Sequence, residues 1–311
     1  MEVDGQVELS ILIVNWNVKN YLRSCLNSIN EKTHGISYEI IVVDNASTDG
    51  STEMLRNEFA EIQIIECQEN LGFGRANNKA LPLTKGKYIG LLNPDTVLEN
   101  DALSLMVKEL ERDTTIAIVG PKLLASDGTI QRVCARKFNK FWDWSKLLLF
   151  TREKSRIYRN YLEVSEYEID QTVECISGAC MVIRRDILDE YIFDPRFFMY
   201  GEDVDLCFTT FRRGWKIYYL SKALVIHYGG ESSKQATEFD QYTISALYAL
   251  VEKRYGKIAS FIFRSLGFSI SIAKLLVTEI VLIVPVFRHD QVWLNRRSIY
   301  KQGVRLALTV D

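Results

Sequence analysis

Short apolar segments alternate with amphipathic segments over the first part of the chain. Apolar residues spaced three and four apart predict helices, and continuous apolar runs predict strands. The predicted strands are 9–14, 38–43, 62–66, 88–92 and 116–119, and the predicted helices are 21–29, 52–59, 75–83 and 102–111. Strands that are apolar throughout are covered on both faces. The pattern therefore predicts an α/β fold with a mostly parallel, doubly wound sheet.

Polar clusters follow three of these predicted strands. Asn15-Trp16-Asn17 follows the first, residues 44–49 follow the second, and Asn93-Pro94-Asp95 follows the fourth. The carboxyl ends of parallel strands lie on one edge of a sheet, where open α/β folds bind their ligands. We therefore expect these clusters to meet at that edge.

Several of these polar residues suit a nucleotide. Asp44 can accept a hydrogen bond from a base or a ribose hydroxyl, although capping the next helix is the simpler role. Arg75 and Asn78 follow Gly72-Phe73-Gly74, and Arg75 suits a base or a phosphate as well as a solvated surface. No Gly-x-Gly-x-x-Gly motif follows the first strand, so a nicotinamide cofactor is not expected.

Asp95 is a candidate metal ligand. A carboxylate at a strand end can hold a divalent cation, and the cation can hold a diphosphate, although a turn aspartate is the simpler role. Asn93 stands where a second carboxylate would complete a two-aspartate site. His227 ends another predicted strand beside Gly229-Gly230, where it suits either a structural role or a place among the metal ligands.

Glu202, Asp203 and Asp205 begin a predicted helix at 203–213. Carboxylates favour a helix N-terminus because of the helix dipole. The aromatic run 197–200 precedes them, however, and predicts the wall of a partly buried pocket. A carboxylate in such a pocket can act as a general base for a sugar hydroxyl. Further strands are predicted at 173–182, 215–219 and 223–227.

Composition narrows the possibilities. The chain has 311 residues, 47% hydrophobic and 25% charged, as in globular proteins, and its net charge of -2 does not suggest nucleic-acid binding. Its six cysteines form no Cys-x-x-Cys pair, so buried free thiols are expected. The first residues are polar and do not resemble a secretory signal, which favours a cytoplasmic location.

The C-terminal region differs from the rest. Residues 252–311 carry 10 Lys and Arg against 4 Asp and Glu, and no uncharged window in 258–287 reaches the roughly 20 residues of a membrane span. Polar and small residues fall on one narrow helical arc: Ser260, Arg264, Gly267, Ser271, Lys274, Thr278 and Glu279. Basic residues follow at Arg288, Arg296, Arg297, Lys301 and Arg305. The pattern predicts helices at a membrane surface through 258–305; packing on the rest of the chain, packing in a homodimer, and a transmembrane span are the alternatives.

Taken together, the clusters resemble a known family. The motifs are Val14–Asn17, Val43–Ser51, Asn70–Gly74, Leu92–Asp95, Gly201–Leu206 and His227-Tyr228. Their order and spacing resemble the inverting family 2 glycosyltransferases with the GT-A fold, and most of all the rhamnosyltransferase-like branch.

The resemblance implies a role for each candidate residue. Asp203 would be the catalytic base, with Glu202 beside it. Asp95 and His227 would bind Mg²⁺ or Mn²⁺. The nucleotide-sugar would lie against Asn15, Asp44, Arg75, Asn78, Asn93 and Asp95. Asn93 departs from the family's usual second aspartate.

The resemblance also implies an activity. It is the transfer of one sugar, with inversion, from a nucleotide-diphospho-sugar such as dTDP-rhamnose to a glycan or lipid-linked acceptor in cell-surface polysaccharide synthesis. The catalytic domain would be 1–235, with an aromatic and basic insertion at 136–170 near the acceptor. A helical extension, 236–311, would associate with the inner face of the plasma membrane. A non-catalytic sugar-nucleotide-binding or scaffold protein is the alternative.

Overall fold

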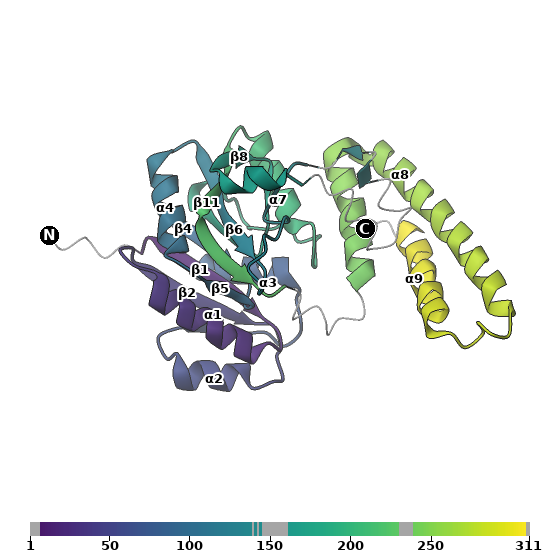
Figure 1. Ribbon diagram of the computed structural model, residues 1–311, viewed down its shortest axis with the longest axis horizontal. Coiled ribbons are helices and arrows are strands. Elements are labelled where there is room, and N and C mark those ends of the chain that lie inside the picture. Colours follow the sequence, from purple (N-terminus) through teal and green to yellow (C-terminus); the bar gives the residue numbers. More distant parts are fainter. Residues whose placement is uncertain (1–6, 139, 142, 145–160, 230–238, 309–311) are drawn as a thin grey trace. The chain divides into compact units, whose positions relative to one another are not determined.

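We describe the chain from a computed structural model, which covers residues 7–138, 140–141, 143–144, 161–229 and 239–308 (Figure 1). The chain divides into two compact units. The first unit comprises residues 1–138, 160–198 and 202–236, and the second, the C-terminal unit, comprises 139–159, 199–201 and 237–311.

The first unit contains a nine-stranded sheet in the order β3-β2-β1-β4-β10-β6-β11-β5, with β8 paired to β11. β7 and β9 form a separate two-stranded sheet. The strands are β1 (Leu9–Asn15), β2 (Tyr38–Asp44), β3 (Gln63–Glu66), β4 (Tyr88–Leu92), β5 (Thr96–Leu98), β6 (Ile116–Leu124), β7 (Ala135–Arg136), β8 (Gln171–Val173), β9 (Cys175–Ile176), β10 (Cys180–Arg184) and β11 (Lys216–His227).

The predicted α/β class is confirmed, but the sheet is mixed. β3, β2, β1 and β4 are parallel neighbours, as are β6 and β11. β10 lies antiparallel between β4 and β6, and β5 lies antiparallel on β11. The apolar pattern could not reveal this difference, because a strand buried on both faces looks the same in either direction.

Helices pack against strands in both halves of the sheet. α3 packs on β1 and β2, and α4 packs on β6 and β11. All six cysteines are buried and free, as predicted. The helices of the first unit are α1 (Lys19–Lys32), α2 (Ser51–Glu58), α3 (Phe73–Ala80), α4 (Ala102–Arg112) and α7 (Glu202–Arg212), with short 3-10 turns at Leu81–Leu83, Val164–Glu168 and Arg185–Ile187.

Two predicted strands, 215–219 and 223–227, form the single strand β11. Its pairing with β6 shifts between Leu220 and Leu224, so the intervening residues form a bulge. Asp170 stabilises this bulge by accepting hydrogen bonds from the backbone N–H and the hydroxyl of Ser221, at 2.8 and 2.6 Å. Polar bulge residues interrupt the apolar run, which explains why the sequence indicated two strands.

The predicted insertion at 136–170 is not a single excursion. Phe138, Leu162 and Tyr167 are buried in the core of the first unit, and Phe138 packs edge-on against Phe208. Trp142 and Phe150 lie outside the described residues. The acceptor role of this region stays a prediction.

The C-terminal unit contains α8 (Phe239–Ile283) and α9 (Gln291–Leu308), joined by residues 284–290. Gly256, with φ 85° and ψ 173°, breaks α8 into two helices. The segment Tyr242–Ile283 is long and apolar enough to cross a membrane by length and composition, and only 11% of its most apolar window is buried.

The polar arc predicted on α8 faces α9. The Arg264 guanidinium donates to the Leu306 carbonyl at 3.2 Å, and a Cβ on Gly303 would lie 2.7 Å from the Ser271 hydroxyl. Further along, the Glu279 carboxylate binds Arg297 Nε at 2.6 Å. The two helices are therefore antiparallel, and small and polar residues line their contact.

We expect Gly86→Ala to destabilise the first unit, because a Cβ there would lie 2.4 Å from the Ser10 nitrogen of β1, which cannot move aside. Gly90→Ala is the control, since its Cβ would meet only a flexible Leu9 methyl at 3.3 Å. Urea unfolding should show a loss of about 1–3 kcal/mol for Gly86→Ala and a smaller loss for Gly90→Ala. Equal losses would contradict the packing of residue 86 on β1.

Candidate active site

The three polar clusters lie on one edge of the sheet, as the sequence indicated. Asn15 and Asp44 end neighbouring parallel strands and are paired in register. Asn93 directly follows β4, which is parallel to β1. His227 ends β11. β10 begins at the same edge, since Cys180 pairs with Leu92.

Asp44 is buried at the end of β2 and is hydrogen-bonded through both oxygens. Asn15 Nδ2 donates to Oδ1 at 2.9 Å, and the Ser47 backbone N–H donates to Oδ2 at 2.9 Å. Asp44 does not cap α2. The N-cap residue of α2 is Gly50, and Asp49 just before it accepts a hydrogen bond from the Ser51 N–H at 3.1 Å. Asp44 instead holds the loop that follows its own strand.

The loops after β1 and β2 interlock. Asn17 Oδ1 accepts a hydrogen bond from the Thr48 N–H at 2.7 Å, and Ser47 Oγ accepts one from the Asn17 N–H at 3.0 Å. Asn17 and Ala46 have positive φ angles of 55° and 63°. Such backbone costs of order 1 kcal/mol or more per residue and persists where its surroundings fix it, which is common at binding sites.

The Gly72-Phe73-Gly74 turn is built for close packing. A Cβ on Gly72 would lie 2.2 Å from the Phe198 carbonyl oxygen, and one on Gly74 would lie 3.1 Å from that of Phe197. The Phe73 N–H donates to the same Phe198 carbonyl at 2.9 Å. The glycines therefore seat the start of α3 against the aromatic segment that precedes Glu202.

Arg75 and Asn78 lie against the segment 192–195. Arg75 Nε donates to the Pro195 carbonyl at 3.0 Å. The Asn78 amide donates to the Phe193 carbonyl at 2.6 Å, and its oxygen accepts from the Ile192 and Phe193 N–H groups, both at 2.9 Å. Backbone groups thus occupy both ends of the Asn78 amide, so we exclude Asn78 from the proposed donor-binding residues.

Asn93, Asp95 and His227 converge. His227 Nε2 lies 3.5 Å from Asp95 Oδ1 and 3.4 Å from Asn93 Nδ2. Strand pairing explains the convergence, because His227 is opposite Thr96 in the β5–β11 register and the Tyr228 N–H donates to the Asp95 carbonyl at 3.0 Å.

Gln131 orients His227 and was missed from the sequence. The Gln131 side-chain NH₂ donates to the His227 carbonyl, which turns Oε1 toward the ring, 2.9 Å from Nδ1. His227 Nδ1 therefore carries the proton, and the Nε2 lone pair faces Asn93 and Asp95. Gln131 lies in a turn 96 positions away in sequence, and no motif marks it.

These residues fit a divalent cation as a partial donor set. Within the described ranges, no three His, Cys, Asp or Glu side chains form a complete metal cluster. Asp95 and His227 offer one carboxylate and one imidazole, ligands that Mn²⁺ accepts together. Diphosphate oxygens and water would supply the remaining ligands, as is usual for cations that bridge phosphates.

Asp203, at the start of α7, is held by three donors. Arg136 Nη2 lies 3.2 Å from Oδ2, the Gly178 N–H donates to Oδ2 at 3.3 Å, and the Val204 N–H donates to Oδ1 at 2.8 Å. Arg136, which comes from β7, was not among the sequence candidates. It fixes the direction of the carboxylate and compensates its charge.

Glu202 is buried beside Asp203 in a different electrostatic state. Burial, followed by the negative charge of Asp203, raises the pKa of Glu202 to about 8. Among the described residues, its Oε2 atom has no hydrogen-bond partner. Glu202 is therefore mostly protonated at neutral pH, and the carboxylate that Arg136 pairs with is that of Asp203.

The fold is that of the GT-A class of glycosyltransferases. Over 97% of this chain, a mannosyltransferase of Pyrobaculum calidifontis solved with GDP-mannose and Mn²⁺ superimposes with TM-score 0.55, 14% identity and 86% of its own chain covered. GalNAc-T7, solved with UDP, GalNAc and Mn²⁺, superimposes with TM-score 0.56 and 15% identity over 97% of this chain and 57% of its own.

The sequence comparisons give the family. The model of Glycosyl transferase family 2 matches residues 10–192, and the chain belongs to that family. An N-acetylglucosaminyl-diphospho-decaprenol L-rhamnosyltransferase of Mycobacterium tuberculosis is 24% identical over 72% of this chain and 77% of its own length. A Bacillus subtilis glycosyltransferase assigned to teichuronic acid biosynthesis is 30% identical over 39% of this chain, which spans about half of that relative (49%).

We expect the high pKa of Glu202 to make stability depend on pH. Between its ordinary value of 4.5 and about 8, the folded chain binds a proton that the unfolded chain releases, so stability falls as pH rises. Glu202→Gln should remove up to about 1.4 kcal/mol per pH unit of that slope. Urea unfolding at several pH values measures both proteins, and identical slopes would contradict the assignment.

Proposed function

We propose that this transferase moves one sugar from a nucleotide-diphospho-sugar to a hydroxyl of a lipid-linked acceptor, with inversion. One observation carries the proposal: residues 177–179 join the base and the cation site. The Gly178 N–H donates to Asp203 at 3.3 Å, and the Ala179 carbonyl accepts from the Asn93 N–H at 2.9 Å. A sugar held at this segment would have the diphosphate on one side and the base on the other.

Asp203 supplies the general base in this proposal. The acceptor oxygen attacks the anomeric carbon while its proton passes to Asp203, and the bond from that carbon to the diphosphate oxygen breaks. A single displacement of this kind inverts the configuration. Arg136 and the Gly178 N–H keep the carboxylate directed during the reaction.

Asp95 and His227 would hold the cation at the diphosphate end. A bound Mn²⁺ or Mg²⁺ would compensate the charge that builds on the leaving nucleoside diphosphate. Gln131 keeps the His227 ring in the orientation that this requires. The two solved relatives that carry Mn²⁺ support a divalent ion.

The nucleotide would lie along the interlocked loops after β1 and β2. Asn15 and Asp44 form the floor of this region, and the buried Asn15 Oδ1 has no hydrogen-bond partner among the described residues. Arg75, whose side chain is exposed on α3, is available for a phosphate or a base. The name of the mycobacterial relative supports rhamnose as the transferred sugar, for which dTDP-rhamnose would be the donor, and a lipid diphosphate glycan as acceptor.

The C-terminal hairpin, residues 257–308, would bind the membrane that carries such an acceptor. The polar arc of α8 faces α9, and exposed apolar residues dominate the rest of the α8 surface: Ile258, Phe261, Leu276, Ile280 and Ile283. α9 exposes polar and basic residues along its length, at Asn295, Ser298 and Lys301, and the apolar Val292 and Leu308 only at its two ends. This division favours a hairpin lying in the membrane interface, with α8 toward the acyl chains.

We expect Asp203→Asn to lower the transfer rate by about 10²–10⁴-fold, because the amide cannot accept the proton. Nucleotide binding should change little. Glu202→Gln is the matched control and should retain most of the activity, since Glu202 is already mostly neutral. Transfer assays with a panel of nucleotide sugars and calorimetry with UDP and dTDP measure both quantities. Full activity of Asp203→Asn would refute the assignment of the base.

Asp95→Ala should weaken Mn²⁺-dependent nucleotide binding more than Asn93→Ala does. Asp95 supplies the charged ligand, whereas the neutral Asn93 amide lies 3.4 Å from His227 Nε2 and would give up that contact when Nε2 binds a cation. Calorimetry with the nucleoside diphosphate, with and without Mn²⁺, should show a loss of about tenfold or more for Asp95→Ala. The reverse order would mean that the cation is held elsewhere.

A further inference from the structure

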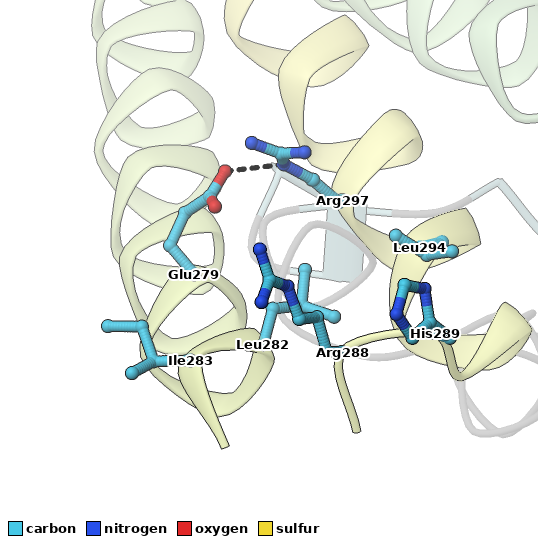
Figure 2. Close-up of a pocket in the computed structure, with 7 residues that line it drawn as sticks. All are labelled: Glu279, Leu282, Ile283, Arg288, His289, Leu294 and Arg297. Atoms are coloured by element: carbon cyan, nitrogen blue, oxygen red, sulfur yellow. Dashed lines mark hydrogen bonds and ion pairs between the residues drawn. The ribbon is translucent and has the colours of Figure 1, made fainter. Parts of the chain in front are cut away.

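A pocket lies at the turn between α8 and α9, at the end of the hairpin (Figure 2). Its volume is about 280 Å³. The lining residues are Glu279, Leu282, Ile283, Arg288, His289, Leu294 and Arg297. Basic side chains thus share the pocket with apolar ones, although the turn belongs to the most apolar surface of the chain.

The pocket has more positive than negative charge. Glu279 pairs with Arg297 at 2.6 Å, and this is the one ion pair drawn among the seven lining residues (Figure 2). Arg288 is exposed and adds a second guanidinium next to that pair. An arginine cluster with one carboxylate suits an anion that takes several hydrogen bonds, as phosphate does.

Strongly apolar residues surround these charges. Ile283 at the end of α8 is 77% exposed, and Val286 within the turn is 81% exposed. Water alone is an unfavourable environment for such a surface. A ligand that offers apolar chains and a phosphate together satisfies both halves of the pocket, and a phospholipid has this composition.

The geometry of the hairpin would place the pocket at the depth of the lipid phosphates. Packed helices lie about 8–10 Å apart, so a hairpin with α8 among the acyl chains has α9 near the level of the headgroups. Arg297 belongs to α9, and Arg288 belongs to the turn that leads into it. Both guanidinium groups would therefore reach the phosphate layer.

We propose that this pocket binds the phosphate group of an anionic bilayer lipid, with Arg288 and Arg297 as donors and Leu282 and Leu294 beside the glycerol and acyl chains. The proposal rests on the membrane-binding part of the proposed function. It adds a specific site to what would otherwise be general attraction of a basic helix to a negative surface.

Flotation of the full chain with vesicles tests the site. The vesicles are phosphatidylcholine alone, phosphatidylcholine with phosphatidic acid, and phosphatidylcholine made equally negative with oleate, which adds no phosphate. The variants are Arg288→Gln and, as matched control, Lys301→Gln, which removes an exposed charge of α9 outside the pocket. Circular dichroism checks that both variants keep their helices.

We expect the wild type to prefer phosphatidic acid over oleate at equal charge. Arg288→Gln should weaken binding to phosphatidic acid by about tenfold or more, and Lys301→Gln by about fivefold at most, as expected for one surface charge. Inorganic pyrophosphate should compete only weakly, since it lacks the acyl chains. Strong calorimetric binding of free pyrophosphate that Arg288→Gln removes would overturn the lipid source, whereas binding that this variant keeps belongs to the proposed donor site.

Two further outcomes would overturn the site. Equal losses for the two variants, or equal binding to phosphatidic acid and oleate, would mean general charge attraction and leave the membrane role intact. Failure of the wild type to float with any vesicle would refute the membrane role itself. Transfer to a soluble acceptor, measured alongside, shows whether the catalytic proposal stands independently of both.

Discussion

The antiparallel placement of β10 between β4 and β6 is the constraint on which the rest of the site depends. Because β10 begins at the edge where β4 ends, the segment 177–179 that leads into it crosses the carboxyl edge of the sheet. Its backbone there binds Asp203 through Gly178 and Asn93 through Ala179. A parallel strand in this position would enter the sheet from the opposite edge and could not connect the two groups.

Gly178 also shows how closely this segment is packed. A Cβ at this position would lie 3.4 Å from the Asp203 Cβ and 3.7 Å from the Phe73 ring. The segment therefore lies between α7 and the start of α3, whose glycines are themselves seated on the Phe197 and Phe198 carbonyls. The proposed base, the proposed cation site and the aromatic segment are thus connected by a few backbone contacts.

The sequence predicted the parts of the site that depend on strand ends. Asn15, Asp44, Asn93 and His227 all lie at the expected edge, because apolar runs mark buried strands and parallel strands share an edge. The direction of β10 was not predictable, since burial on both faces carries no sign of direction.

The residues that orient His227 and Asp203 could not be identified from the sequence either. Gln131 reaches His227 across 96 positions, and Arg136 reaches Asp203 across 67. Both are polar residues in short turns or strands with no local pattern, and their partners are distant in sequence, so only the tertiary structure reveals the contacts. Asn78 shows the opposite case. The resemblance assigned it to the nucleotide, but its side-chain amide hydrogen-bonds the backbone of Ile192 and Phe193.

The C-terminal helices illustrate a different limit of sequence reasoning. The arc of small and polar residues on α8 was visible from periodicity, but a period does not say which face meets water. In the hairpin that arc packs against α9. Arg297 pairs with the charge of Glu279, and the absence of a side chain at Gly303 lets Ser271 pack close to the α9 backbone. The apolar face is left outside, which reverses the arrangement of a soluble helix pair and agrees with a lipid environment.

Asn93 gains a physical explanation from its neighbours. A second carboxylate at position 93 would add a charged ligand, but it could not donate a hydrogen bond to His227 Nε2. The Asn93 amide nitrogen lies 3.4 Å from Nε2 and can donate there while no cation is bound, and Gln131 fixes the opposite side of the ring. The imidazole is thus held from two sides with its lone pair toward Asp95. With Asn in place of a second carboxylate, the negative charge of the proposed cation site would come from Asp95 and from the diphosphate.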